Sequence, residues 1–325
     1  MNALLDGRRV DPFMEYLSAL PTWDRNSRLH RWIFRCWYVD EGYERLAYWA
    51  SLYLFLGAVH RTLDPGCKLD EVPIIVGPQG IGKTTAVEQM FPPEHQGEWY
   101  ASGLNLAAPE KERVERLQGR VVIECGEMAG SGKAELESLK DFVTRRDDGA
   151  VRLSYRRNPE PMPRRCIMVG TTNDDEFLPN DPTGNRRFVP VRVHGGGYGN
   201  VIQTLAARDQ LWAEALWLYR AGMQARLPDD LKALQAEVNE EHRRSDGVLE
   251  NAVVTWLERN GGKFLLGDLI TGVGLVGEHD VAARATQRDV ARATAILRRL
   301  GYERLPQERG SGGGRVRFWD KAVPA

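Results

Sequence analysis

Runs of apolar residues that end in glycine or polar residues divide the first two thirds of the chain into a regular series of elements. Four short runs are continuous rather than alternating, which is typical of strands buried on both faces of a parallel sheet. These runs are Val72 to Val76, Arg120 to Cys125, Cys166 to Thr171 and Phe188 to Val193. Helical spacing lies between them, from Gly82 to about Met90 and over 133–145. Strands that alternate with helices predict an α/β fold with a mostly parallel sheet covered on both faces.

The chain before the first of these strands has a different pattern. Residues 11–62 are predicted to be helices rich in Trp, Tyr and Leu, and Pro65-Gly66 interrupts them. The most apolar stretch, Leu46 to Val59, is too short to span a bilayer and carries aromatic residues, so a buried helix is expected. Aromatic residues at helical spacing favour core positions over a base-stacking surface, and they include Trp32, Trp37, Tyr48 and Trp49.

The pattern changes again after the glycine run 195–197. Helical spacing extends from about 200 to 224 and from 228 to 243. Beyond Ser245, further helices are expected at 247–259, 264–271 and 287–300, followed by two short strands around GSGGG. Three helices followed by a hairpin in about 80 residues form the outline of a winged helix-turn-helix.

Composition and charge restrict the function only loosely. The chain has 325 residues and a net charge of −1, so any nucleic-acid partner would have to be bound by local basic patches. The N-terminus lacks the apolar run of a signal peptide, and a cytoplasmic protein without a membrane partner is expected. The four cysteines form no C-x-x-C pair, which favours reduced core thiols over a zinc site. They are Cys36, Cys67, Cys125 and Cys166.

Residues 77–84, GPQGIGKT, match the phosphate-loop motif G-x-x-x-x-G-K-[ST], with a buried strand before them and a helix after. This context disfavours a chance match in a loop. Glycines let the backbone N–H groups surround phosphate oxygens, Lys83 is expected to reach the β- and γ-phosphates, and the Thr84 hydroxyl to ligate magnesium. ATP and Mg²⁺ are therefore the expected cofactors. The expected nucleotide-binding residues are Gly77, Pro78, Gln79, Gly80, Ile81, Gly82, Lys83, Thr84 and Thr85.

Two acidic residues follow the second buried strand. The strand VVIE ends at Glu124, which is the Walker B pattern, and Glu127 follows in ECGEM. The end of such a strand lies beside the phosphate loop. Glu124 is expected to hold magnesium, through water, and Glu127 to act on the attacking water. The alternative is that one of the two only caps the next helix.

Polar and basic residues flank the two later strands. Asn173 ends the strand CIMVGTTN, where an amide can hold the lytic water or contact the γ-phosphate; the alternative is a turn before Asp174. Arg186 and Arg187 in TGNRRF precede the fourth strand. An arginine can stabilise the transition state across a subunit interface, and the alternative for each is a surface ion pair.

Residues from about 10 to 195 resemble the virulence-associated E family of phage- and mobile-element-borne ATPases, which are similar to superfamily 3 helicases. The resemblance implies a RecA-like AAA+ core, a homo-oligomeric ring that is expected to be hexameric, and work on DNA in replication. About 70 residues precede the loop, so priming activity is not expected of this chain. Superfamily 3 members commonly have adjacent acids, whereas Cys125 and Gly126 separate Glu124 from Glu127 here. The resemblance rests on PFMEYLSALPTWDRNSRL, VHRTLDPGCKLDEVPIIVGPQGIGKTT, VVIECGEM, LKDFVTRRDDGAVRLSYRRN and PRRCIMVGTTNDDEFLPNDPTGNRRFVPV.

Two basic segments are candidate DNA contacts. Residues 144–165 hold seven arginines against three acids, and their alternating pattern suggests a hairpin. The resemblance places Arg156 and Arg157 of this hairpin near single-stranded DNA in the central pore, and the alternative is a solvated charged loop. In a winged helix the third helix enters the major groove and the wing meets phosphates, although winged helices also bind proteins. The corresponding candidates are Arg288, Arg292, Arg315 and Arg317.

Together these patterns predict an N-terminal helical region (1–66), a P-loop ATPase core (67–195), a helical connector (196–244) and a winged-helix domain (245–325). The expected function is that of a DNA-dependent ATPase, a ring-forming helicase or translocase. The alternative is a nucleotide-gated DNA-binding regulator without unwinding activity. A P-loop kinase is disfavoured because nothing resembles an acceptor-binding lid.

Overall fold

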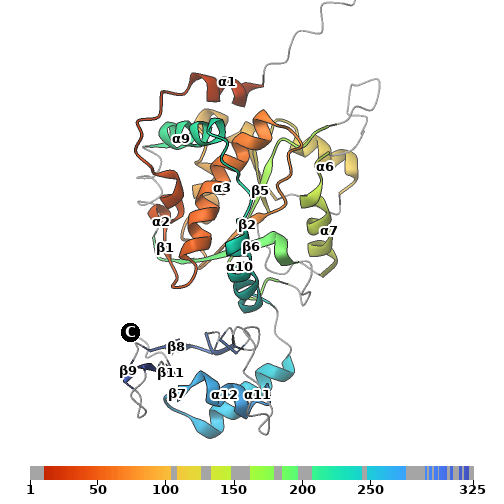
Figure 1. The fold of residues 1–325 in the computed structure, drawn as a ribbon. Coiled ribbons are helices and arrows are strands. Elements are labelled where there is room, and N and C mark those ends of the chain that lie inside the picture. The colour runs from red at the N-terminus through yellow and green to blue at the C-terminus, as the bar shows by residue number, and fades with distance from the viewer. Residues whose placement is uncertain are drawn as a thin grey trace, which may run out of the picture. The chain divides into compact units, whose positions relative to one another are not determined.

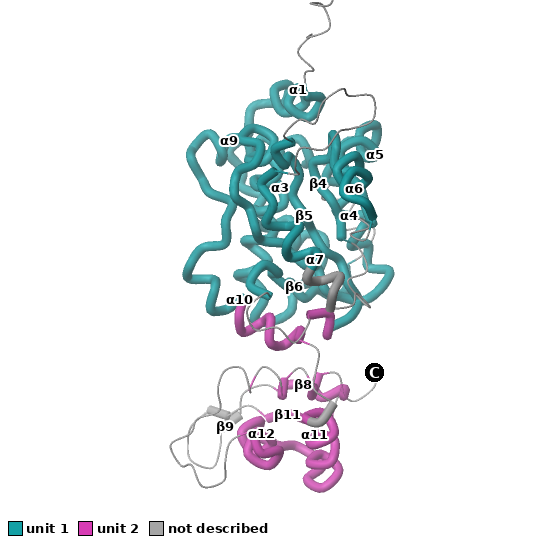
Figure 2. Tube along the Cα trace, turned by 90° about the vertical axis from the view of Figure 1, so that its right-hand side faces the viewer, with its two compact units in different colours: residues 1–175, 183–235 teal, residues 176–182, 236–325 magenta. Residues whose placement is uncertain are grey.

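The computed structural model of the chain has two compact units, which are coloured separately in Figure 2. Unit 1 comprises residues 1–175 and 183–235, and unit 2 comprises residues 176–182 and 236–325. The structure describes residues 11–103, 108–125, 133–147, 162–178, 185–196, 207–243, 247–275, 290, 293–294, 296–298, 300–305, 308–309, 315–316 and 318–321.

Unit 1 combines helices with one central sheet (Figure 1). Its described α-helices are α1 (Pro12–Ala19), α2 (Trp32–Cys36), α3 (Glu44–Leu63), α4 (Lys83–Glu88), α5 (Gln96–Trp99), α6 (Glu110–Leu117), α7 (Lys133–Thr144), α9 (Arg208–Arg220) and α10 (Asp229–Glu241), the last of which continues into unit 2. Its described 3-10 turns are η1 (Leu29–Arg31), η2 (Pro93–His95) and η3 (Asn185–Arg187).

The described strands of unit 1 form a six-stranded sheet in the order β1-β6-β2-β5-β4-β3. Neighbouring strands from β6 to β3 are parallel, and β1 pairs with β6 antiparallel. The α/β class with a mostly parallel sheet, predicted from the continuous apolar runs, is confirmed. The strands are β1 (Tyr38–Val39), β2 (Val72–Val76), β3 (Tyr100–Ser102), β4 (Val122–Cys125), β5 (Ile167–Thr172) and β6 (Phe188–His194).

Helix α3 is the central helix of unit 1. It contacts strands β2, β5 and β6 as well as α9, so most of its side chains are buried. The apolar stretch Leu46 to Val59 lies inside this helix, as expected for a buried helix. Trp32, Trp37 and Trp49 are core residues, whereas Tyr48 is partly exposed.

The N-terminal segment is fixed by residues far along the chain. The buried carboxylate of Glu214 on α9 accepts hydrogen bonds from the backbone nitrogens of Arg28 and Leu29, at 2.8 and 3.0 Å, and from the Ser27 hydroxyl at 2.7 Å. A buried carboxylate is stable when such donors satisfy its oxygens. These bonds satisfy backbone groups at the start of η1 and hold it against α9.

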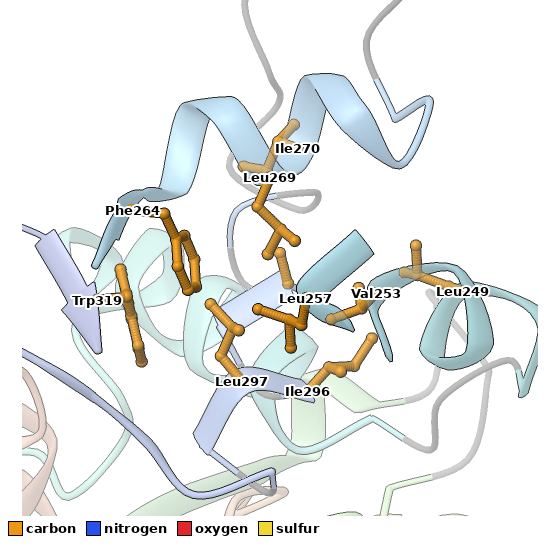
Figure 3. Close-up of a cluster of buried hydrophobic side chains, with 10 residues drawn as sticks. Leu249, Val253, Leu257, Phe264, Leu269, Ile270, Ile296, Leu297 and Trp319 are labelled. Atoms are coloured by element: carbon orange, nitrogen blue, oxygen red, sulfur yellow. The ribbon is translucent and has the colours of Figure 1, made fainter. Parts of the chain in front are cut away.

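Unit 2 has its own apolar core, shown in Figure 3. Strands β7, β11 and β8 form a three-stranded antiparallel sheet in that order, and β9 pairs with β10. The elements are α11 (Gly247–Asn260), β7 (Phe264–Leu265), α12 (Leu266–Gly272), β8 (Tyr302–Arg304), β9 (Glu308–Arg309), β10 (Arg315–Val316) and β11 (Phe318–Lys321). The core comprises Leu249, Val253, Leu257, Phe264, Leu269, Ile270, Ala293, Ile296, Leu297 and Trp319.

Several element boundaries differ from the sequence-based prediction. The predicted helix over 264–271 begins as strand β7, because Phe264 and Leu265 pair with β11. The predicted helix from Gly82 to Met90 is shorter, since α4 ends at Glu88. Strands β1, β3, β8 and β11 were not predicted. They are two to four residues long, too short to show a period in the sequence, and exist because neighbouring strands complete their hydrogen bonds.

Candidate functional site

The loop between β2 and α4 holds the glycines of the phosphate-loop motif. Gly80 and Gly82 have φ values of 84° and 79°, the left-handed region that favours glycine. Gly77 is required for a different reason: a Cβ atom built on it would lie 2.3 Å from the carbonyl oxygen of Val193 on β6. The backbone of the loop therefore lies close against the end of the neighbouring strand, where only glycine fits.

A pocket of about 340 Å³ lies over this loop. Thr171 and Thr172, at the C-terminal end of β5, line it together with residues of the loop. Asn173, which follows β5, is exposed and lines the pocket together with the glycines. The pocket is lined by Gln79, Gly80, Gly82, Lys83, Thr84, Thr85, Thr171, Thr172 and Asn173.

Lys83 supplies the positive charge at this loop. Its Nζ atom donates hydrogen bonds of 2.7 Å to the carbonyl oxygens of Gly77 and Pro78. Partial burial lowers the pKa of the Lys83 ammonium, and the Glu124 carboxylate opposes this effect. An anion in the pocket would be attracted to this ammonium and would favour its charged form.

Glu124 is the polar centre of the site and is almost fully buried at 1% exposure. Its Oε1 accepts hydrogen bonds from the hydroxyls of Thr84, at 2.8 Å, and Thr171, at 2.5 Å. Its Oε2 accepts a hydrogen bond from the hydroxyl of Tyr100. Hydroxyl and carboxylate oxygens are the ligands that Mg²⁺ prefers, so Thr84 and Glu124 could hold this ion between β4 and α4.

Tyr100 on β3 was not recognised from the sequence. Burial raises the pKa of its phenol, and the charge of Glu124 raises it further, so the hydroxyl stays protonated and donates to the carboxylate. Strand β3 places this side chain beside Glu124 because Ser102 is paired with Glu124 in the sheet. No pattern within the segment EWYAS marks this role, because it depends on the pairing of β3 with β4.

A tryptophan from the N-terminal segment supports the tip of the loop. The indole Nε1 of Trp37 donates a hydrogen bond of 2.7 Å to the carbonyl oxygen of Ile81, and the Trp37 ring is buried. Trp37 directly precedes β1, the antiparallel edge strand next to β6. The N-terminal segment is therefore part of the same structural unit as the phosphate loop.

Arg186 and Arg187 do not approach the pocket of their own chain. They lie in η3, directly before β6, which runs parallel to β2 and pairs Phe188 with Val72. The two arginines precede the first residue of β6, whereas Gly77 follows the last residue of β2, so they lie at opposite ends of parallel strands. Because a strand advances about 3.3 Å per residue, the separation is about 20 Å. The backbone there is fixed, since the Gln235 side chain donates to the carbonyl oxygen of Arg186 at 2.7 Å, while the Arg186 side chain is exposed.

The remaining predicted site residues lie outside the described residues in whole or in part. Glu127, Arg156, Arg157, Arg288, Arg292 and Arg317 belong to segments that the structure does not describe. The backbone of Arg315 belongs to β10, but its side chain is not described.

The described residues contain neither a cluster of metal ligands nor a membrane-spanning helix. Among the described residues, no group of three or more His, Cys, Asp or Glu side chains is placed to hold a metal ion. Within those residues no helix is both long and apolar enough to cross a membrane. The four cysteines form no disulfide; Cys36 and Cys166 are buried, and Cys67 and Cys125 are partly exposed.

Comparison with known proteins identifies the larger part of the chain. Residues 17–244 match the virulence-associated protein E-like domain. This range includes the phosphate loop, Glu124, Asn173 and the arginines of η3. Among curated proteins, none matches the sequence.

Solved structures give weaker similarities. An A-form apo structure of the NrS-1 C-terminal region is 11% identical, with 94% of this chain and 78% of that chain covered and a TM-score of 0.44. Another apo structure of the NrS-1 C-terminal region is 12% identical over 87% of this chain and 76% of that chain, with a TM-score of 0.41. TM-scores below 0.5 do not establish a common fold.

Proposed function

Because the chain belongs to the virulence-associated protein E-like domain family, we propose that it is a magnesium-dependent ATPase that works on DNA in the replication of a phage or mobile element. The finer form of the proposal is a ring-forming helicase or translocase of the superfamily 3 type, assembled as a homo-oligomer of six chains in the cytoplasm. The strand order, in which β2 lies between β6 and β5 and β4 follows β5, supports a RecA-like AAA+ core.

One observation carries the ATPase proposal. Four polar groups meet at the C-terminal ends of the strands, although they come from three separate segments of the chain. Lys83, Thr84 and Asn173 line one pocket, and Glu124 accepts a hydrogen bond from Thr84. A cation, a hydroxyl, a buried carboxylate and an amide around one open pocket are the groups that triphosphate hydrolysis requires. Each alone has a structural explanation, but their convergence favours a nucleotide site.

The roles in hydrolysis follow from the chemistry of each group. Lys83 and the loop N–H groups would bind the β- and γ-phosphates, and Thr84 with Glu124 would hold Mg²⁺. The cation would neutralise the charge that develops on the phosphate oxygens. Glu127 would orient or deprotonate the attacking water, and Asn173 would contact that water or the γ-phosphate.

A ring would explain the position of Arg186 and Arg187. Arg186 and Arg187 lie at the opposite end of the strands from the loop of their own chain, so a role in hydrolysis would require the pocket of another chain. In a head-to-tail ring each subunit contacts the next through a different surface, so an arginine far from its own pocket could reach the nucleotide of a neighbouring subunit. An arginine supplied in this way stabilises the transition state of phosphoryl transfer.

The DNA contacts belong to the same proposal. Arg156 and Arg157 would meet phosphates in the central pore, where a fork of donors suits phosphate oxygens. Unit 2 has helices α11 and α12 and strands β7, β8 and β11 around one core, which supports a winged helix-turn-helix. Its DNA-binding candidates are Arg288, Arg292, Arg315 and Arg317.

The direct test is phosphate release from ATP in the presence of Mg²⁺. Lys83→Ala should abolish hydrolysis and weaken nucleotide binding, because the β/γ-phosphates lose their main cation. Lys111→Ala, which changes a half-exposed lysine on α6, is the matched control and should retain wild-type turnover. Wild-type turnover in Lys83→Ala would refute the ATPase assignment of this loop.

A second pair of variants separates a motor from a nucleotide-gated regulator. In a motor, Arg156→Ala with Arg157→Ala should remove stimulation by single-stranded DNA and leave basal hydrolysis intact. Removal of residues 245–325 should lower DNA affinity and leave stimulation at saturating DNA. The opposite pattern would make the C-terminal region the DNA sensor and would favour the regulator. Stimulation should be measured at several salt concentrations, because phosphate contacts weaken with salt.

A further inference from the structure

Tyr38 and His194 form an exposed aromatic pair on β1, the outer strand of the sheet, and its neighbour β6. Tyr38 is 65% exposed, the largest fraction among the big apolar side chains of the described residues. It pairs across the strands with His194, and the two rings have centroids 5.7 Å apart and planes inclined by 30°. An aromatic pair this exposed is unusual, because aromatic surface is normally buried.

The order of the strands gives a direction to any nucleotide bound at the loop. The pocket is lined by residues of β5 in addition to the loop, and Glu124 lies on β4 beyond it. A triphosphate bound there with its terminal phosphate near Glu124 would extend away from β5 and β4. Strands β6 and β1 lie on the other side of β2, so the nucleoside would lie toward them.

Two contacts bring this aromatic pair close to the loop. Val193, the neighbour of His194, approaches the first glycine of the loop so closely that a Cβ on Gly77 would lie 2.3 Å from the Val193 carbonyl oxygen. Trp37, the neighbour of Tyr38, donates its indole hydrogen bond to Ile81 at the loop tip. His194 is also the last residue of β6, and the loop follows the last residue of the parallel neighbour β2, so both lie at the C-terminal ends of the strands.

We propose that Tyr38 and His194 form the binding surface for the nucleobase of the triphosphate, a role that rests on the proposed nucleotide site. The base would stack on the exposed ring of Tyr38 with one edge toward His194, because a centroid distance of 5.7 Å leaves no room for a base between the two rings. Aromatic stacking is available to every base, so this surface supplies affinity, while hydrogen bonds supply selectivity.

His194 also gives the surface a preference for adenine over guanine. Its Nδ1 lies 2.6 Å from a carboxylate oxygen of Asp40, which favours the tautomer with the proton on Nδ1. In the neutral ring, Nε2 is then an acceptor. An acceptor suits the exocyclic amino group of adenine and opposes the carbonyl oxygen at the same position of guanine.

The test compares three ligands by calorimetry with Mg²⁺ on the full chain: ATP, GTP and inorganic tripolyphosphate. Tyr38→Ala should weaken ATP binding about 10-fold and leave tripolyphosphate binding unchanged, since the phosphate loop is intact. Tyr38→Phe should bind ATP as wild type does, because the ring is kept. His194→Phe should retain stacking and lose the preference for ATP over GTP. Tyr48→Ala removes a partly exposed aromatic on α3 and is the matched control.

The outcomes separate this proposal from that of the nucleotide site. If Tyr38→Ala binds ATP like wild type, or weakens ATP and tripolyphosphate equally, Tyr38 does not contact the base. If wild type prefers GTP, the role of His194 is wrong. If tripolyphosphate fails to bind wild type, or binds Lys83→Ala equally well, the nucleotide site itself is wrong, whatever Tyr38 does.

Discussion

Thr84 donates a hydrogen bond of 2.8 Å to Glu124, forty positions further along the chain. The contact joins the first turn of α4 to β4, so the hydroxyl and carboxylate oxygens that would hold a cation already face each other. Little rearrangement is then needed when an ion binds, which favours affinity because the ligands are preorganised.

This relationship predicts different effects for the two acids. Glu124→Gln should weaken Mg²⁺ binding and lower turnover by at least 10-fold, because an amide is a poorer cation ligand and its NH₂ group would face the hydroxyls that now donate. Glu127→Gln should retain ATP binding and lose hydrolysis, since only the group acting on water is changed. Binding and steady-state turnover, measured against Mg²⁺ concentration, distinguish them. If Glu127→Gln keeps full turnover while Glu124→Gln has none, Glu127 does not act on the water.

Tyr100→Phe should reduce the stability of unit 1 by about 1–3 kcal/mol, because it leaves a buried oxygen of Glu124 without its donor. The raised pKa of Tyr100 keeps its hydroxyl a donor at alkaline pH, so the difference should persist to pH 9. Denaturant unfolding measures this change. Tyr48→Phe, at a partly exposed ring, is the control and should change stability by less than about 0.5 kcal/mol. Equal effects of the two variants would argue against a stabilising bond to Glu124.

Arg186→Ala and Arg187→Ala should be made separately. At least one of them should be inactive alone and regain part of its activity when mixed with Lys83→Ala subunits, because a mixed ring restores complete interfaces. Turnover of the mixtures, with assembly checked by sedimentation, is the measurement. Mixtures that assemble and remain inactive would show that these arginines do not act across an interface.

Gly77→Ala should impair nucleotide binding at least 10-fold, because its Cβ would lie 2.3 Å from a backbone oxygen of β6 and the loop must move. Gly97→Ala on α5 is the control, since a Cβ there meets nothing within 4 Å. Tripolyphosphate binding reports on the loop directly. Unchanged binding in Gly77→Ala would mean that the loop tolerates the shift.

Helix α12 of unit 2 contains a matched pair of glycines. A Cβ on Gly272 would lie 2.0 Å from the indole nitrogen of Trp256, whereas one on Gly267 would meet nothing within 4 Å. Gly272→Ala should therefore cost about 1–3 kcal/mol of stability, and Gly267→Ala should be neutral or stabilising by up to about 1 kcal/mol. Denaturant midpoints of the two variants test this, and a neutral Gly272→Ala would contradict the packing around Trp256.

The sequence predicts those parts of the site that depend on local patterns. The phosphate loop and the buried strands before Glu124 and Asn173 are recognisable because glycines and continuous apolar runs have direct conformational meaning. Tyr100 and Tyr38 were not recognised, because both lie on short strands at the edges of the sheet. Their position depends on which strands pair, and no single segment encodes that pairing.

The arginines before β6 illustrate a different kind of limit. Their residue type and the neighbouring strand identify Arg186 and Arg187 as candidates for the site. Their distance from the pocket becomes clear only when β6 is known to run parallel to β2, with Phe188 beside Val72. Strand direction, rather than residue type, therefore excludes them from the pocket of their own chain.

The bonds between Glu214 and the N-terminal segment have a consequence for the order of folding. The backbone nitrogens of Arg28 and Leu29 donate to Glu214, which lies about 185 residues later in the chain. The indole nitrogen of Trp49 likewise donates to the carbonyl oxygen of Ala225. On the ribosome, the first-made helices are exposed until α9 and the segment after it emerge, so unit 1 completes its folding late in synthesis. A nascent chain stalled before residue 207 should be sensitive to proteases at its N-terminal end, whereas one released after residue 235 should be protected there.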